Sequence, residues 1–145
     1  MTEPEPSAPP DAELRSILGE ARTIAVVGLS SKPDRPSYEV AGFLQERGHR
    51  IVPVNPNETE VLGERAYASI LDVPAEIPIE IVDVFRRAED TPPIAEEAVR
   101  RGAEVLWLQL GIVNDEARRI AEDAGLTVIM GICIKSTIER LQGTP

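Results

Sequence analysis

The sequence has few aromatic residues, one cysteine and one histidine. Aromatic side chains make up 3% of its 145 residues, so the core must consist mainly of Val, Ile, Leu and Ala. The lone Cys133 excludes an internal disulfide and favours a reducing compartment. With His49 as the only histidine, a Cys/His metal site is not expected. No catalytic triad or carboxylate pair emerges, so we predict neither catalytic nor metal-binding residues.

The chain also lacks long apolar runs and any excess of basic residues. No run reaches the length of a membrane span, and the acidic, proline-rich N-terminus does not have the pattern of a secretory signal. The net charge of −10 argues against general nucleic-acid binding, which needs a basic surface. A small anionic ligand is not excluded, because it contacts one loop and not the average surface. We therefore predict a cytoplasmic protein with neither nucleic acid nor membrane as a partner.

Hydrophobic runs alternate with helical patterns along most of the chain. Five short apolar runs predict strands over residues 23–27, 50–54, 79–85, 104–109 and 126–130. Residues with helical spacing, starting at the possible caps Asp11, Ser37, Thr91 and Asn114, predict helices between them, and a last helix is expected over 134–141. This alternation predicts an α/β, Rossmann-like three-layer sandwich around a five-stranded parallel sheet of order 3-2-1-4-5.

We find no internal repeat and no second domain. Residues 1–12 are rich in proline and acidic residues, and we expect them to form a disordered tail. Residues 13–145 are expected to form a single domain, because this length is typical of one core.

The candidate ligand loop follows the first strand. In open α/β sheets the ligand lies at the carboxyl ends of the strands, at the switch point of strand order, here expected between the first and fourth strands. Gly28 permits a tight turn, and the next helix presents free N–H groups that suit a phosphate. The loop also contains hydroxyl and cationic groups that can bind phosphate: Ser30, Ser31, Lys32, Arg35 and Ser37. An equally weighted alternative is an exposed turn in which water solvates the charges of Lys32 and Arg35.

The loop differs from two common nucleotide-binding motifs. The dinucleotide fingerprint needs glycine where Ser30 and Pro33 stand, and an acidic residue at the end of the second strand, where Asn55 stands. A Walker P-loop is absent as well. Both departures argue against an NAD(P)-dependent enzyme.

Other polar residues end the remaining strands. Phe85 is the last residue of the third strand and Arg86 follows it. The ring could pack on an adenine or pantetheine arm with the guanidinium near a phosphate, or the pair could be a core ring followed by a solvated cation. Gln109 ends the fourth strand. Its side chain either contacts a ligand or is an amide whose hydrogen bonds are satisfied within the protein. We expect Asp83 to be buried or paired, and His49 to lie away from the ligand edge.

Several runs together resemble the stand-alone CoA-binding domain family, which is similar to the CoA-binding domain of the succinyl-CoA synthetase α subunit. The resemblance covers residues 23–141 and rests on the runs 24–30, 34–37, 52–56, 82–87 and 107–111. It implies that the first loop, including Leu29, holds the phosphates of coenzyme A. By analogy, the adenosine and pantetheine path would be lined by Asn55, Pro56, Phe85, Arg86 and the segment from Leu108 to Gly111.

The chain departs from this family near its C-terminus. Family members often carry an acidic and a basic residue before the cysteine, and a Glu-His pair in the last helix. Here these places hold Gly131-Ile132 and Thr137-Ile138. The phosphorylated histidine of the synthetase lies in a further domain that this sequence does not contain, so ligase activity in isolation is not expected.

The leading hypothesis is therefore a CoA or acyl-CoA binding protein without evident catalytic residues. One alternative is an NAD(P)-binding oxidoreductase fragment, and another is a regulatory subunit of an enzyme that uses acyl-CoA. A homodimer is left open.

Overall fold

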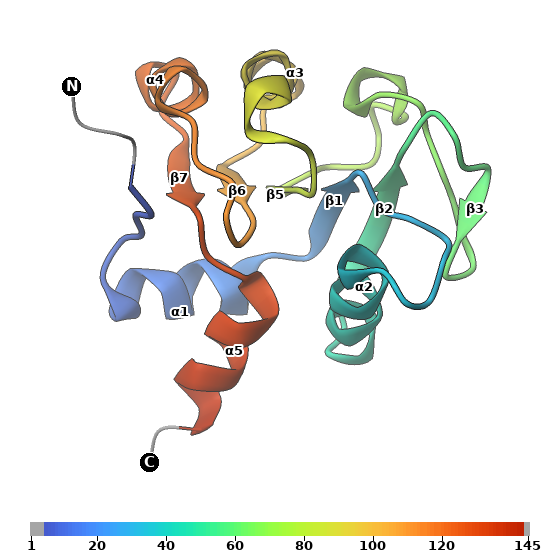
Figure 1. Cartoon of the computed structure of the whole chain (residues 1–145), viewed down its shortest axis with the longest axis horizontal. Coiled ribbons are helices and arrows are strands. Elements are labelled where there is room, and N and C mark those ends of the chain that lie inside the picture. The colour runs from blue at the N-terminus through green and yellow to red at the C-terminus, as the bar shows by residue number, and fades with distance from the viewer. Residues whose placement is uncertain (1–4, 144–145) are drawn as a thin grey trace.

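The computed structural model describes residues 5–143 as an α/β fold with three layers (Figure 1). The central sheet is five-stranded and parallel, which confirms the predicted fold class. Its strands are β1 (Thr23–Val27), β2 (Arg50–Val54), β5 (Ile81–Val84), β6 (Val105–Leu108) and β7 (Thr127–Met130). The helices are α1 (Asp11–Glu20), α2 (Pro36–Glu46), α3 (Thr91–Arg101), α4 (Asp115–Asp123) and α5 (Ile134–Gly143). A small hairpin, β3 (Glu60–Val61) and β4 (Glu64–Arg65), and the 3₁₀ turns η1 (Ile70–Asp72) and η2 (Ala88–Asp90) complete the fold.

The sheet is buried on both faces, as the continuous apolar runs predict. Helices α3 and α4 cover one face, and α1, α2 and α5 cover the other (Figure 1). Every residue of β1, β5 and β6 is buried. The helices contribute small residues such as Ala95, Ala98 and Ala117 to the first core, while Trp107 is the largest fully buried side chain of the second.

The order of the strands differs in one detail from the predicted order. The sheet runs β2-β1-β5-β6-β7, so the third strand along the chain pairs with the first and not with the second. The physical reason lies at the outer edge of β2. There Tyr67 N–H donates to Pro53 O at 3.0 Å, and Asn55 N–H donates to Tyr67 O at 2.8 Å. Because this segment occupies the edge, the switch point moves to the junction of β1 and β5.

Three of the four predicted helix N-caps are wrong, and one is confirmed. Asn114 caps α4 as expected, its Oδ1 accepting from Ala117 N–H at 2.8 Å. Pro10, Arg35 and Asp90 occupy the cap positions of α1, α2 and α3, and their side chains make no cap bond. The expected caps Asp11, Ser37 and Thr91 lie inside the helices, where Ser37 bonds to the preceding loop and Thr91 to a carbonyl.

The N-terminal segment is ordered over part of the expected tail. Residues 1–4 lie outside the described part of the chain. Ser7 forms an antiparallel bridge with Met130, with N–H···O distances of 3.0 and 2.9 Å, and α1 begins at Asp11. This corrects the expectation of disorder from Ser7 onward. Within residues 5–143, no helix is long and apolar enough to cross a membrane.

Candidate functional site

The turn at Gly28 is held between the two strands that flank β1. Gly28 N–H donates to Val54 O at 2.8 Å, and Phe85 N–H donates to Val27 O at 2.8 Å. Gly28 has a φ of +88°, and a Cβ there would lie 2.3 Å from Phe85 O. Only glycine fits both conditions without a shift of the backbone. The first loop therefore leaves the sheet directly beside the end of β5.

The loop after Gly28 is closed by serine hydroxyls. Ser30 N–H donates to the Ser37 Oγ at 3.1 Å, which ties the loop to the second residue of α2. Lys32 N–H donates to the Ser30 Oγ at 3.1 Å. With Pro36 at the first helical position, the first turn of α2 begins beside this loop. Pro36 has no N–H, and the N–H groups of Tyr38 and Glu39 donate to Arg35 O at 3.1 and 3.2 Å. Within the first turn, as the structure describes it, the Ser37 N–H is therefore the group left for an anion.

A shallow pocket of about 300 Å³ lies at this corner. It is lined by Gly28, Ser30, Lys32, Arg35, Pro36, Ser37 and Phe85. Six of these seven residues were predicted, and they come from the ends of β1 and β5 and the start of α2. The pocket therefore lies at the observed switch point, where open α/β sheets bind ligands.

Three cationic side chains lie at or near this pocket. Lys32 and Arg35 line it, and the Arg86 Nε lies 3.4 Å from the place of a Cβ on Gly28. None of the three forms an ion pair or side-chain hydrogen bond within the described residues. Unpaired cations beside a helix N-terminus produce a local positive potential on a chain of net charge −10.

Two further predicted residues, Leu29 and Asn55, are buried beneath the loop and hold its backbone in place. Leu29 is fully buried in the core. Asn55 is 8% exposed, and its Nδ2 donates to Leu29 O at 3.0 Å, while its Oδ1 accepts from Asn57 N–H at 3.0 Å. The side chain of Asn55 is thus used within the protein and fixes the loop. Ser31 and Pro56 are exposed and do not line the pocket.

Gln109 and Gly111 do not reach the pocket, because β5 lies between β1 and β6. Gln109 is 3% exposed, and its Nε2 donates to the Asp83 Oδ1 while its Oε1 accepts from Ile134 N–H at 3.4 Å. The satisfied amide, the second of the two interpretations left open, is the arrangement found. Gly111 is exposed at the turn after β6, with a φ of +81°.

Asp83 is fully buried, as expected, on the α2 and α5 side of the sheet. Burial raises the pKa of this carboxyl to about 8, although the hydrogen bond from Gln109 acts in the opposite direction. The Asp83 Oδ2 has no partner among the described residues. The raised pKa favours the neutral carboxyl at pH 7, and the group forms part of the packing rather than of the pocket.

One residue of the site was missed. The Glu58 Oε2 accepts from Ser31 N–H at 2.8 Å and so brings a carboxylate to the cationic loop. Glu58 follows β2 by four positions in a polar turn, and nothing in its spacing marks it. Neither Glu58 nor Ser31 lines the pocket, so this carboxylate fixes the loop beside it.

Two residues that the sequence singled out lie away from the pocket. His49 lies at the opposite edge of the sheet, as predicted, with its Nδ1 3.0 Å from Ala21 O. Cys133 is half-buried at the start of α5 and packs against the second core. No cluster of potential metal ligands occurs in the part of the chain that the structure describes.

Comparison with known protein families gives one match over most of the chain. A family model described as a CoA binding domain matches residues 22–139. The chain is 46% identical over 127 residues to the uncharacterized protein YneT of Bacillus subtilis, covering 88% of this chain and 93% of that protein. It is also 31% identical over 122 residues to the α subunit of an ADP-forming acetate–CoA ligase II of Pyrococcus furiosus. That match covers 78% of this chain but 27% of the ligase subunit.

Solved structures agree with the fold. A hypothetical protein from Pyrococcus horikoshii OT3 superposes with a TM-score of 0.90 at 40% identity, covering 99% of this chain and all of that one. Prb, described as the PH1109 protein redesigned for binding, also gives a TM-score of 0.90, at 38% identity and with 95% and 96% of the two chains covered. These likenesses extend over the whole Rossmann-like core.

Proposed function

The chain belongs to the CoA-binding domain family, and from this premise we propose that it binds coenzyme A or an acyl-CoA through the pocket at the β1–β5 switch point. The observation that carries the proposal is the corner at Gly28. There a backbone turn that tolerates no Cβ, the start of α2 and three unpaired cations meet at one end of the sheet. Each of these features favours a phosphate group.

The phosphates of coenzyme A are proposed to lie against the Ser30–Ser37 loop. Arg35 and Lys32 supply charge from the loop, and Arg86 supplies it from the end of β5. Asn55 and Leu29 act indirectly, because they hold the loop in shape. The residues after β6, including Gln109 and Gly111, are one strand farther away and are not proposed as phosphate contacts.

Isothermal titration with coenzyme A, acetyl-CoA, NAD and ATP tests the proposal. We expect saturable binding of coenzyme A that is tighter than that of NAD, because the dinucleotide fingerprint and its ribose-binding carboxylate are absent. Absence of binding at millimolar coenzyme A would contradict the proposal. Tight binding of NAD alone would favour the oxidoreductase alternative.

Arg35→Ala examines the phosphate contact itself. Loss of one charge-assisted hydrogen bond should weaken coenzyme A by about 1–3 kcal/mol. Arg119→Ala is the matched control, because Arg119 is an exposed arginine of α4, on the other side of the sheet. Equal affinities of the two variants would leave Arg35 as a surface charge.

The proposed role is binding, without a catalytic step. A stable partner that uses acyl-CoA would make the chain a regulatory subunit, and copurification followed by mass spectrometry of the retained ligand distinguishes this from a free-standing binder. The acetate–CoA ligase relatives are several times longer than this chain, so their activity is not transferred to it. A cytoplasmic location stays a prediction from the sequence, based on the single cysteine and on the lack of a long apolar run and of a secretory-signal pattern.

A further inference from the structure

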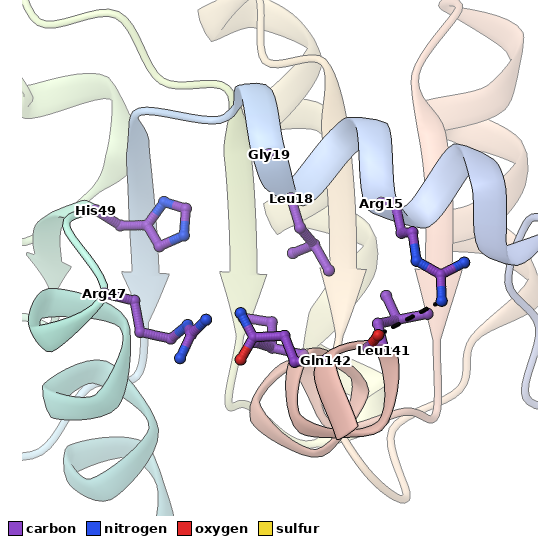
Figure 2. A pocket seen from close by; sticks show the side chains of 8 residues that line it. Arg15, Leu18, Gly19, Arg47, His49, Leu141 and Gln142 are labelled. Carbon is purple, nitrogen blue, oxygen red and sulfur yellow. Dashed lines mark hydrogen bonds between the residues drawn. The ribbon is translucent and has the colours of Figure 1, made fainter. Parts of the chain in front are cut away.

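A second pocket lies at the opposite end of the sheet from the Gly28 corner, and Figure 2 shows the side chains that surround it. Its volume is about 370 Å³, which falls in the range of small-molecule sites. It is lined by Arg15, Leu18, Gly19, Arg47, His49, Ile138, Leu141 and Gln142. These residues come from α1, from the end of α2 and the turn after it, and from the last turns of α5.

The lining combines cationic groups with an apolar floor. Arg15, Arg47 and His49 approach from different elements, and Leu18 and Leu141 lie between them (Figure 2). Ile138 adds a third apolar side chain to the lining. No carboxylate lines the pocket, although the chain contains 25 acidic residues against 15 basic ones. A ligand that fits this lining has an anionic head and an apolar body.

Two of the three cationic groups also serve the protein. The Arg15 Nη2 donates to Leu141 O at 3.4 Å. Arg140 is the main cause of the lowered pKa of Asp11, and Arg15 adds a smaller effect. The His49 Nδ1 donates to Ala21 O at 3.0 Å, which leaves the Nε2 on the pocket side of the ring (Figure 2). The ends of α1, α2 and α5 lie near the pocket, and cations commonly stabilise helix C-termini. Arg15 and His49 alone would therefore not indicate a ligand.

Arg47 differs from them. Its guanidinium lies 5.3 Å from the centre of the Phe43 ring and makes no hydrogen bond or ion pair with any residue of the 5–143 range. Stacking on a ring leaves the N–H edge of the guanidinium open to an acceptor in its own plane. A carboxylate matches this edge with two parallel hydrogen bonds. The N–H donors of the Arg47 guanidinium are thus the feature of this pocket that indicates an anionic ligand.

We propose that this second pocket binds a monocarboxylate with an apolar chain, whose head group pairs with Arg47 and whose chain covers Leu18, Ile138 and Leu141. The pocket is separated from the Gly28 corner by the length of the sheet. The proposal therefore does not depend on coenzyme A binding.

Titration with octanoate, in the absence of coenzyme A, tests the site. We expect saturable binding, and amide NMR shifts that concentrate in residues 15–19, 47–49 and 138–142. Arg47→Gln should weaken octanoate about tenfold or more, as loss of a charge-assisted pair predicts. Arg50→Gln is the matched control, because Arg50 is exposed at the same edge but does not line the pocket. Arg47→Lys should restore part of the affinity, since it keeps the charge but not the fork.

Octanamide provides the comparison on the unaltered protein, so the result does not depend on the folding of a variant. It has the same chain without the charge, and we expect it to bind much more weakly than octanoate. Equal binding of octanamide, absence of saturable octanoate binding at millimolar concentration, or an equal effect of Arg50→Gln would each overturn the proposal. Competitive displacement of octanoate by coenzyme A would overturn it too, by assigning octanoate to the Gly28 corner.

Discussion

The buried carboxyl of Asp83 should make the stability of the protein fall as the pH rises toward 8. Asp83 is completely buried, its Oδ1 accepts from the Gln109 amide, and its Oδ2 has no partner within residues 5–143. Burial raises the pKa of the folded state from an ordinary 3.8 to about 8. Ionisation above that pH places a charge among apolar side chains with one amide to solvate it.

The sign of the effect follows from the number of protons bound. Between the two pKa values the unfolded chain has lost the proton of Asp83, whereas the folded chain keeps it. The folded state therefore binds one more proton, and the free energy of unfolding decreases by about 1.4 kcal/mol for each pH unit. From about pH 5.5 to about pH 8 the decrease amounts to about 3 kcal/mol. The two carboxyls with a lowered pKa, Asp11 and Glu39, affect stability only in more acidic solution.

Urea unfolding across this pH range measures the slope for the wild type and for Asp83→Asn. The asparagine still offers an oxygen to Gln109 but does not titrate, so we expect its stability profile to be flatter by about the slope given above. A constant cost of the substitution does not affect this comparison, because only the slope is compared. Asp72→Asn, at an exposed aspartate, should keep the wild-type slope. Parallel profiles for the wild type and Asp83→Asn would refute the reasoning.

Two further predictions concern groups that hold the backbone. Gly28→Ala places a Cβ 2.3 Å from Phe85 O, so it should destabilise the fold and weaken the binding of coenzyme A. Gly63→Ala is the control: it has a similar φ of +79° but nothing within 4 Å of its Cβ, so it should cost only the backbone strain of about 1–2 kcal/mol. Equal losses of stability in thermal unfolding would contradict the role of the close approach at Gly28. Arg101→Gln should lower the free energy of unfolding by about 3 kcal/mol, because its guanidinium bonds the carbonyls of Ile70, Val73, Pro74 and Ile77 at 2.6–3.1 Å, while the exposed Arg100→Gln should stay near the wild type.

The sheet could be predicted from the sequence because its signal is local. Apolar runs such as 23–27 and 105–108 are buried on both faces, which is typical of strands in a parallel sheet covered by helices on both sides. The helices between the strands could be predicted from the helical spacing of their apolar residues. The cap at Asn114 could be predicted because its side-chain oxygen suits a free N–H at a helix start. The caps at Ser37 and Thr91 were wrong because the chain supplies other partners for their hydroxyls, Ser30 N–H and Ala88 O.

The order of the strands was not readable, because it depends on a contact between distant segments. Tyr67 covers the free edge of β2 through hydrogen bonds of its backbone, and a backbone bond leaves no signature in the side chains. The same holds for Glu58, whose bond to Ser31 N–H joins residues 27 positions apart. Such contacts are fixed by the packing of the whole chain rather than by any local pattern.

This one contact changes how the candidate site is understood. With the third strand beside β1, the neighbour of Gly28 is Phe85, and the lack of space for a Cβ at Gly28 follows directly from Phe85 O. Gln109 lies one strand farther out, and its amide is used by Asp83 and by the start of α5. The polar residues at the strand ends thus divide into two groups, one open to a phosphate and one closed within the core. The exposed cations Lys32 and Arg35 belong to the first group, and this division, rather than the motif alone, favours a ligand at the Gly28 corner.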